Sequence, residues 1–188
     1  MSTKVEATIE DLYKVEGKAE LVNGEIILMS PTGLLPGYAA GEIFSSLRDY
    51  SKRRKFGRAV GDNVAFVVDL PHRKSFCPDA AFYTGPNTGM KFGEGAPVFA
   101  VEVRSKNDYG PRAERKMAKK REEYFAAGSL VVWDVDLLGD DVVRVYRAST
   151  PETATIYHRG ETAEAEPAVP GWTMPVDDLF PEPSQTNL

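Results

Sequence analysis

One segment, Val98–Val103, constrains the fold more than any other, because five of its six residues are apolar. A strand with apolar residues on both faces has to be covered on both, as in the centre of a sheet with helices on either side. A second strand of this kind, Leu130–Val135, follows a helical segment, Pro111–Ala127, that starts at a proline and is ended by Gly128. This succession predicts a mixed α/β or α+β sheet.

An N-terminal hairpin is predicted by Asn23-Gly24, which lies between two apolar runs at 20–22 and 25–29. Both positions of this dipeptide tolerate positive φ, so it favours a tight turn between antiparallel strands. Ahead of the hairpin, a capping box at 8–11 predicts a short helix that ends by Gly17.

Apolar residues at helical spacing predict a longer amphipathic helix from Tyr38 to Arg54. The other elements are shorter, and we expect a loop at 84–97 and strands at 60–69, 79–83, 142–147 and 153–158. We treat residues 1–188 as a single domain. Its core is expected at about 8–159, with an acidic segment at 160–188 that packs on the core or on a partner.

Composition and motifs exclude several classes of protein. We expect neither a membrane span nor a secretory signal, since no apolar run approaches about 18 residues and the first residues are polar. A single cysteine, Cys77, cannot form an internal disulfide, which is typical of a reducing cytoplasm. The two histidines, His72 and His158, do not support a zinc site, and the glycines at 93–95 lack the Lys-Ser/Thr of a phosphate loop.

Positive charge is concentrated in two clusters, although the net charge of the chain is -5. The segment after Gly160 has six acidic residues and no Lys or Arg, so residues 1–159 carry a net charge of +1. The clusters are Lys52, Arg53, Arg54, Lys55 and Arg58, and Arg112, Arg115, Lys116, Lys119, Lys120 and Arg121. Such clusters allow a nucleic-acid partner, and they are also typical of solvated helix faces.

Glu102 is the most unusual residue, because it interrupts the run that should form the centre of the sheet. An unpaired buried carboxylate is strongly unfavourable, so Glu102 needs a basic partner or a metal. Strand alternation places it on the same face as Ala100 and Arg104. The purely structural alternative is a buried ion pair of Glu102 with Arg104 or with a lysine.

Two further residues can meet Glu102. Asp79 follows a proline and opens an apolar strand, and two acids at neighbouring strand ends provide the few hard oxygen ligands that Mg²⁺ takes from a protein. Lys120 lies three residues after Met117 and four before Tyr124, at the edge of the apolar stripe of its helix. The structural alternatives are a turn-forming role for Asp79 and a surface position for Lys120.

A series of short motifs occurs in one fixed order from about Thr8 to Phe180. It comprises Glu20–Gly33, Pro78-Asp79, Val101–Ser105, Lys120–Gly128, Val132–Asp136 and Val169–Phe180. In order and spacing this series resembles the Uma-two family of restriction endonucleases, within the PD-(D/E)XK nuclease superfamily. The resemblance covers nearly the whole chain.

The resemblance implies a restriction-endonuclease-like core with flanking helices and a catalytic site of four residues, Glu20, Asp79, Glu102 and Lys120. Asp79 and Glu102 match the metal-binding acids, and we expect the Val103 carbonyl to join them around Mg²⁺ or Mn²⁺. The superfamily lysine normally lies two residues after the glutamate, where this chain has Arg104; Lys120 matches the displaced lysine of the family.

Two departures from the family pattern stand out. Lys106 follows Ser105 where a proline is usual, and Tyr38 or its neighbours stand where family members often carry histidine. We therefore assign no role to a histidine.

The leading hypothesis is a Mg²⁺-dependent endonuclease that hydrolyses phosphodiester bonds of duplex DNA. Lys120 would orient the attacking water or stabilise charge on the phosphorane, and candidate contacts to the DNA backbone are Lys116, Arg104, Lys52, Arg53 and Arg54. A nuclease-fold protein that binds or assembles without cleaving is one alternative, favoured by Arg104 and the acidic net charge. The other is a structural domain in which Glu102, Arg104 and Lys120 form a buried salt-bridge network.

Cleavage of both strands with one site per chain predicts a homodimer. The expected contact surfaces are the hairpin at 20–29 and the apolar terminal residues Val169, Trp172, Met174, Val176, Leu179 and Phe180. The alternative is that the terminal residues are covered by their own domain.

Overall fold

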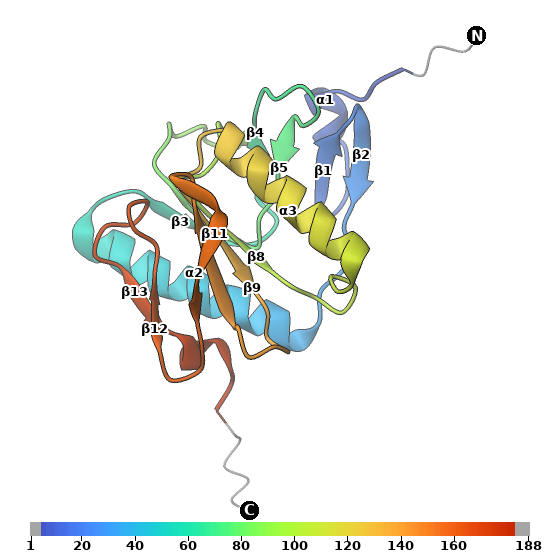
Figure 1. Ribbon diagram of the computed structural model, residues 1–188. Helices are drawn as coiled ribbons and strands as arrows, with labels where there is room; N and C mark the ends of the chain where they lie inside the picture. The colour runs from blue at the N-terminus through green and yellow to red at the C-terminus, as the bar shows by residue number, and fades with distance from the viewer. Residues whose placement is uncertain (1–4, 183–188) are drawn as a thin grey trace, which may run out of the picture.

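A six-stranded mixed sheet is the centre of the computed structural model, which describes residues 5–182 (Figure 1). The spatial order of its strands is β11-β10-β9-β8-β6-β3. β8 is parallel to β9, and all other neighbouring pairs are antiparallel. The strands are β3 (Arg58–Val60), β6 (Ala80–Tyr83), β8 (Phe99–Val103), β9 (Val131–Val135), β10 (Val143–Arg147) and β11 (Thr150–Tyr157).

Two helices pack on opposite faces of this sheet (Figure 1). α2 packs Ile43 into the core that holds Phe99 and Val101, whereas α3 packs Tyr124 against Ala100 on the other face. Successive residues of β8 therefore enter different cores, which confirms the predicted central strand. None of the helices within residues 5–182 is long and apolar enough to cross a membrane. The helices are α2 (Leu34–Arg54) and α3 (Pro111–Ala126).

Smaller elements surround the sheet. The predicted hairpin is present, with Asn23 and Gly24 at φ 51° and 69° in its turn. Its first strand is joined to the segment before β5 by the Lys74 N–H, which donates to the Leu21 carbonyl (2.9 Å). These elements are α1 (Ile9–Leu12), β1 (Ala19–Val22), β2 (Glu25–Leu28), β4 (Phe66–Val67), β5 (Ser75–Phe76), β7 (Gly93–Glu94), β12 (Thr162–Glu164), β13 (Thr173–Pro175) and the 3₁₀ helix η1 (Val176–Leu179).

The prediction of a single strand at 60–69 is wrong. A turn after Gly61, in which Asn63 adopts φ 62°, ends β3 and separates it from β4. The two strands belong to different sheets, because β4 pairs with β5 and β7. The predicted loop at 84–97 likewise contains β7, where Gly93 has no side chain and the Phe66 ring lies 2.5 Å from the place of a Cβ.

The start of α2 differs from the prediction. α2 starts at Leu34 rather than Tyr38, because Pro36 falls in the first helical turn, where a missing N–H needs no partner. α1 agrees with the prediction: it starts at the capping box and ends at Leu12, before Gly17, and the chain then forms i→i+3 hydrogen bonds such as that from the Lys14 N–H to the Asp11 carbonyl.

The apolar terminal segment packs on its own sheet. Trp172 is 2% exposed, with its ring centroid 5.2 Å from that of Trp133 and 5.7 Å from that of Phe99. Its indole Nε1 donates to Ser46 Oγ on α2 (3.0 Å). Val169, Met174, Val176 and Leu179 are buried beside it and Phe180 is partly buried. The expectation that these side chains form a dimer contact is therefore wrong, because they are already covered.

Replacing Trp172 with alanine tests whether the terminal segment and the sheet unfold as one unit. We expect Trp172→Ala to lower the free energy of unfolding by about 3–5 kcal/mol, as for other buried aromatic side chains. Chemical denaturation measures it, with Leu138→Ala at a residue 77% exposed as the control, expected to change stability by about 0.5 kcal/mol or less. A loss below about 1 kcal/mol for Trp172→Ala would show that the segment is only loosely attached.

Candidate active site

Pairing of β6 with β8 brings Asp79 beside Glu102. Ala80 pairs with Val101, and just before this pair the Asp79 N–H donates to the Val101 carbonyl (3.0 Å). Asp79 Oδ2 accepts a hydrogen bond from the Val103 N–H (2.7 Å). The carboxylate of Asp79 is thereby fixed next to the residue that follows Glu102.

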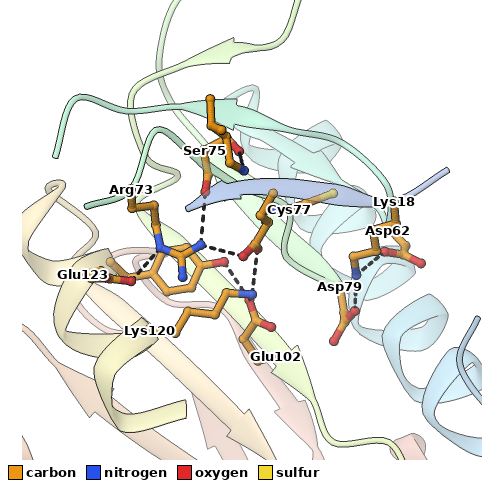
Figure 2. A network of polar contacts seen from close by, with 12 residues as sticks. Lys18, Asp62, Arg73, Ser75, Cys77, Asp79, Glu102, Lys120 and Glu123 are labelled. Carbon is orange, nitrogen blue, oxygen red and sulfur yellow. Dashed lines mark hydrogen bonds and ion pairs between the residues drawn. The ribbon is translucent and has the colours of Figure 1, made fainter. Parts of the chain in front are cut away.

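Lys120 reaches from α3 onto two carboxylates (Figure 2). Its Nζ lies 2.8 Å from Glu102 Oε1 and 2.8 Å from Glu20 Oε1. Tyr124, four residues further along the helix, donates its hydroxyl to the same Glu102 oxygen (2.7 Å). Three of the four predicted catalytic side chains are therefore linked by direct contacts of Lys120, and Asp79 lies directly before the neighbouring strand β6.

Glu20 is held at both of its oxygens. Oε1 accepts from the Cys77 N–H (2.9 Å) in addition to Lys120, and Oε2 lies 2.5 Å from Arg73 Nη1. Arg73 Nε in turn lies 2.6 Å from Glu123 Oε2 on α3. Only 5% of the Glu20 side chain is exposed, so these donors replace the water that a carboxylate would otherwise bind.

A second group of charges lies on the Asp79 side of the site (Figure 2). Lys18, just before β1, places its Nζ 2.5 Å from Asp79 Oδ1 and 2.7 Å from Asp62 Oδ1. The sequence analysis missed both residues, as well as Arg73. Asp62 did have a local signal: the sequence Gly-Asp-Asn at 61–63 favours a turn, which would end the expected strand before Asp62. Lys18 and Arg73 carry no comparable local signal.

The network shifts the pKa values of its members in different directions. Burial, together with the nearby carboxylates of Asp79 and Glu20, raises the pKa of Glu102. Burial acts the same way on Glu20, but the positive charges of Lys120 and Arg73 prevail and lower its pKa to about 2. Burial opposes the charged form of Lys120, yet Glu102 and Glu20 hold its pKa above the usual value. Lys120 is therefore a protonated donor at neutral pH.

A hollow of about 160 Å³ opens beside Asp79 and Asp62, between α2 and the end of β8. It forms because α2 presents small residues there; a Cβ at Gly41 would meet no atom within 4 Å. At roughly 30 Å³ per water molecule the space holds about five waters. A phosphate group or a hydrated cation fits this space next to the Asp79 carboxylate.

Arg104 belongs to a separate network. Its Nε and Nη2 each lie 2.7 Å from an oxygen of Asp134, and the guanidinium also pairs with Glu114. The side chain is 3% exposed. The pair of Glu102 with Arg104 is therefore not formed, whereas the alternative pair with a lysine is. The expected contact of Arg104 with nucleic acid is corrected as well, since its side chain is buried and its donors are engaged by the buried Asp134 and by Glu114 at the surface.

The other candidate nucleic-acid contacts lie at two separate places. Lys116 is exposed on α3, one helical turn before Lys120. Lys52, Arg53 and Arg54 are exposed in the last turn of α2. Lys52 follows Phe44, the last residue of α2 that lines the hollow, by eight residues, which corresponds to about 12 Å along the helix. The α2 cluster is thus not adjacent to Asp79.

Asp79 and Glu102 are the two acids that the sequence predicts as ligands of a divalent cation. Within residues 5–182 no three His, Cys, Asp or Glu side chains form a closed metal cage. Mg²⁺, however, is commonly bound by only one or two carboxylates, with water and substrate phosphate as its other ligands. The oxygen donors of these two acids are chemically suited to such a cation.

The low pKa of Glu20 makes the stability of the protein depend on pH. Its folded-state pKa of about 2 lies below the ordinary 4.5, so the stabilisation is present above about pH 4.5 and is lost as the pH falls toward 2. We expect Glu20→Gln to lower the free energy of unfolding by about 3–5 kcal/mol at pH 7, and the difference from wild type to shrink below pH 4.

Urea denaturation at pH 7 and pH 3 measures both effects. Glu122→Gln, at an exposed position on α3, is the control and should match wild type at both pH values. A difference between Glu20→Gln and wild type that is equally large at both pH values would contradict the assigned pKa.

The fold is shared with a solved structure. That structure is of a protein from Anabaena variabilis ATCC 29413, described as "a putative nuclease belonging to DUF820". The TM-score is 0.71 at 18% sequence identity, and the match covers 92% of this chain and 97% of that one. At this identity the likeness establishes a common fold. A search of curated proteins finds no match.

The family comparison covers more than the fold. The profile of the Uma2 family, described as "Putative restriction endonuclease", matches residues 7–177. This span includes the hairpin, both helices that cover the sheet and all the residues of the site. It also agrees with the order of motifs noted in the sequence. The chain therefore belongs to the Uma2 family of restriction-endonuclease-like proteins.

Proposed function

We propose that this chain is a Mg²⁺- or Mn²⁺-dependent endonuclease that hydrolyses phosphodiester bonds of duplex DNA. The observation that carries the proposal is the convergence of Asp79, directly before β6, with Glu102 on β8 and Lys120 on α3. Family membership and the nuclease-like fold support the reaction class.

The charge of the network supports a divalent cation. Its carboxylates are Glu20, Asp62, Asp79, Glu102 and Glu123, and its cationic groups are Lys18, Arg73 and Lys120. With Glu102 ionised, five negative and three positive charges leave -2, which one divalent ion would neutralise. Asp79 and Glu102, with the Val103 carbonyl, would hold the ion. When bound, such an ion polarises the scissile phosphate and lowers the pKa of the attacking water.

Lys120 and Glu20 have complementary roles in this proposal. Lys120 stays protonated, so it donates hydrogen bonds that orient the attacking water or stabilise charge on the phosphorane. Glu20 has both oxygens occupied by Arg73, Lys120 and the Cys77 N–H. It therefore acts by positioning Lys120.

The DNA backbone would first contact an exposed lysine on α3. Lys116 lies one turn from Lys120 and carries its charge into solvent. Lys52, Arg53 and Arg54 lie about 12–15 Å along α2 from the hollow, a distance of about four phosphates at 3.4 Å each along one strand. They would contact the flanking duplex and contribute a salt-sensitive part of the affinity.

A homodimer is part of the same proposal, since one site per chain cuts one strand and a duplex has two. With the terminal apolar residues buried, the hairpin is the remaining surface that the sequence analysis named. Leu28 on β2 is 66% exposed there.

A second candidate function is a nuclease-fold protein that binds nucleic acid without cleaving it. Two observations favour it: Arg104 stands where the superfamily lysine is expected and is fully engaged by Asp134 and Glu114, and Asp79 already holds an ammonium group. Mn²⁺ binding without cleavage of any nucleic acid would select this function.

Nicking of supercoiled plasmid in the presence of Mg²⁺ or Mn²⁺ tests the proposal. We expect Asp79→Asn and Glu102→Gln to lose at least about 100-fold in rate, since each removes a metal ligand. Lys120→Met should lose about 10²–10³-fold, as expected for one group that stabilises transition-state charge. Glu122→Gln, an exposed charge on the helix that carries Lys120, is the matched control. Undiminished cleavage by the Asp79 and Glu102 variants would refute the site assignment.

A further inference from the structure

Lys18 contacts Asp79, one of the two acids proposed to bind the metal ion. Asp79 Oδ2 is engaged by the Val103 N–H, so Oδ1 is the oxygen that faces the site, and Lys18 Nζ lies 2.5 Å from it. The Lys18 side chain is only 17% exposed and Asp79 20%, so the pair is largely shielded from water. The ammonium is paired with two carboxylates at once, Asp79 at 2.5 Å and Asp62 at 2.7 Å.

We infer that Lys18 is an internal counter-cation that competes with the divalent ion for Asp79 and thereby sets the metal affinity of the site. The inference rests on the proposed function, because it takes Asp79 to be a metal ligand. The ammonium lies 2.5 Å from Oδ1, so a metal ion on that oxygen would be repelled by a positive charge in contact with its own ligand. Metal binding is therefore favoured when Lys18 moves away from Asp79.

Asp62 provides the place to which Lys18 moves. Its Oδ1 already lies 2.7 Å from Lys18 Nζ, and its side chain is 50% exposed, so it can follow the ammonium into solvent. The ammonium thus leaves Asp79 without losing every carboxylate partner. Lys120 differs in this respect, because its partner Glu20 is fixed by Arg73 and by the Cys77 N–H. Lys18 is therefore a displaceable cation, whereas Lys120 is a permanent one.

Calorimetric titration of Mn²⁺ into the full-length protein tests this inference without any nucleic acid. We expect Lys18→Met to bind Mn²⁺ at least about tenfold more tightly than wild type, because a competing charge in contact with Asp79 is removed. Lys18→Arg retains the competing charge and should bind no more tightly than wild type. Lys14→Met removes a lysine that is 73% exposed and paired with Asp11, and should leave the affinity unchanged.

The outcomes separate the inference from the proposed function. Equal or weaker Mn²⁺ binding by Lys18→Met, with binding retained in wild type, would overturn the role of Lys18 and leave the metal site intact. Binding by neither protein would overturn the proposed function together with the inference. Thermal melting establishes that each variant is folded, and Lys18→Gln, which keeps a polar group near Asp62, replaces Lys18→Met if the latter does not fold.

Discussion

The rest of the site depends on the ion pairs that the buried carboxylate of Glu20 forms with Lys120 and Arg73. Glu20 lies on β1, outside the six-stranded sheet, yet it joins the hairpin to α3 through Lys120 and to the segment before β5 through Arg73. A carboxylate this deeply buried is tolerated only when its charge and both oxygens are satisfied. The partners that stabilise Glu20 therefore also fix the ammonium of Lys120 in front of Glu102.

The sheet supplies the other half of the site through strand register. Pairing of Ala80 with Val101 brings Asp79 to the end of β8, where the Val103 N–H orients its carboxylate. The hairpin, the sheet and α3 thus each contribute charged side chains to the site, and the negative charges outnumber the positive ones. We interpret this excess as the electrostatic basis of metal binding, and Lys18 as the group that partly compensates it when no metal is present.

A strand buried on both faces appears in the sequence as a run of apolar residues, and a packed helix appears as an apolar stripe. For this reason β8, the unusual position of Glu102 in it and the inward position of Lys120 could be predicted. The turn at Asn63 has a local signal too, Gly-Asp-Asn at 61–63, although a single strand was expected at 60–69. The partners of the acids, in contrast, were beyond reach. Lys18 is 61 residues from Asp79, and Arg73 is 53 from Glu20, so only the folded sheet brings them together. The buried tail was left open for the same reason, since apolar content alone does not identify what covers it.

The central claim is that Asp79 and Glu102 bind a divalent cation at the edge of the sheet. Anomalous diffraction from crystals soaked in Mn²⁺ tests it most directly, because the signal locates the metal without reference to activity. We predict a single strong peak bonded to Asp79 and Glu102, with Lys18 moved away from Asp79 toward Asp62. A soaked crystal with no peak at these carboxylates, or with manganese bound elsewhere, would contradict the account.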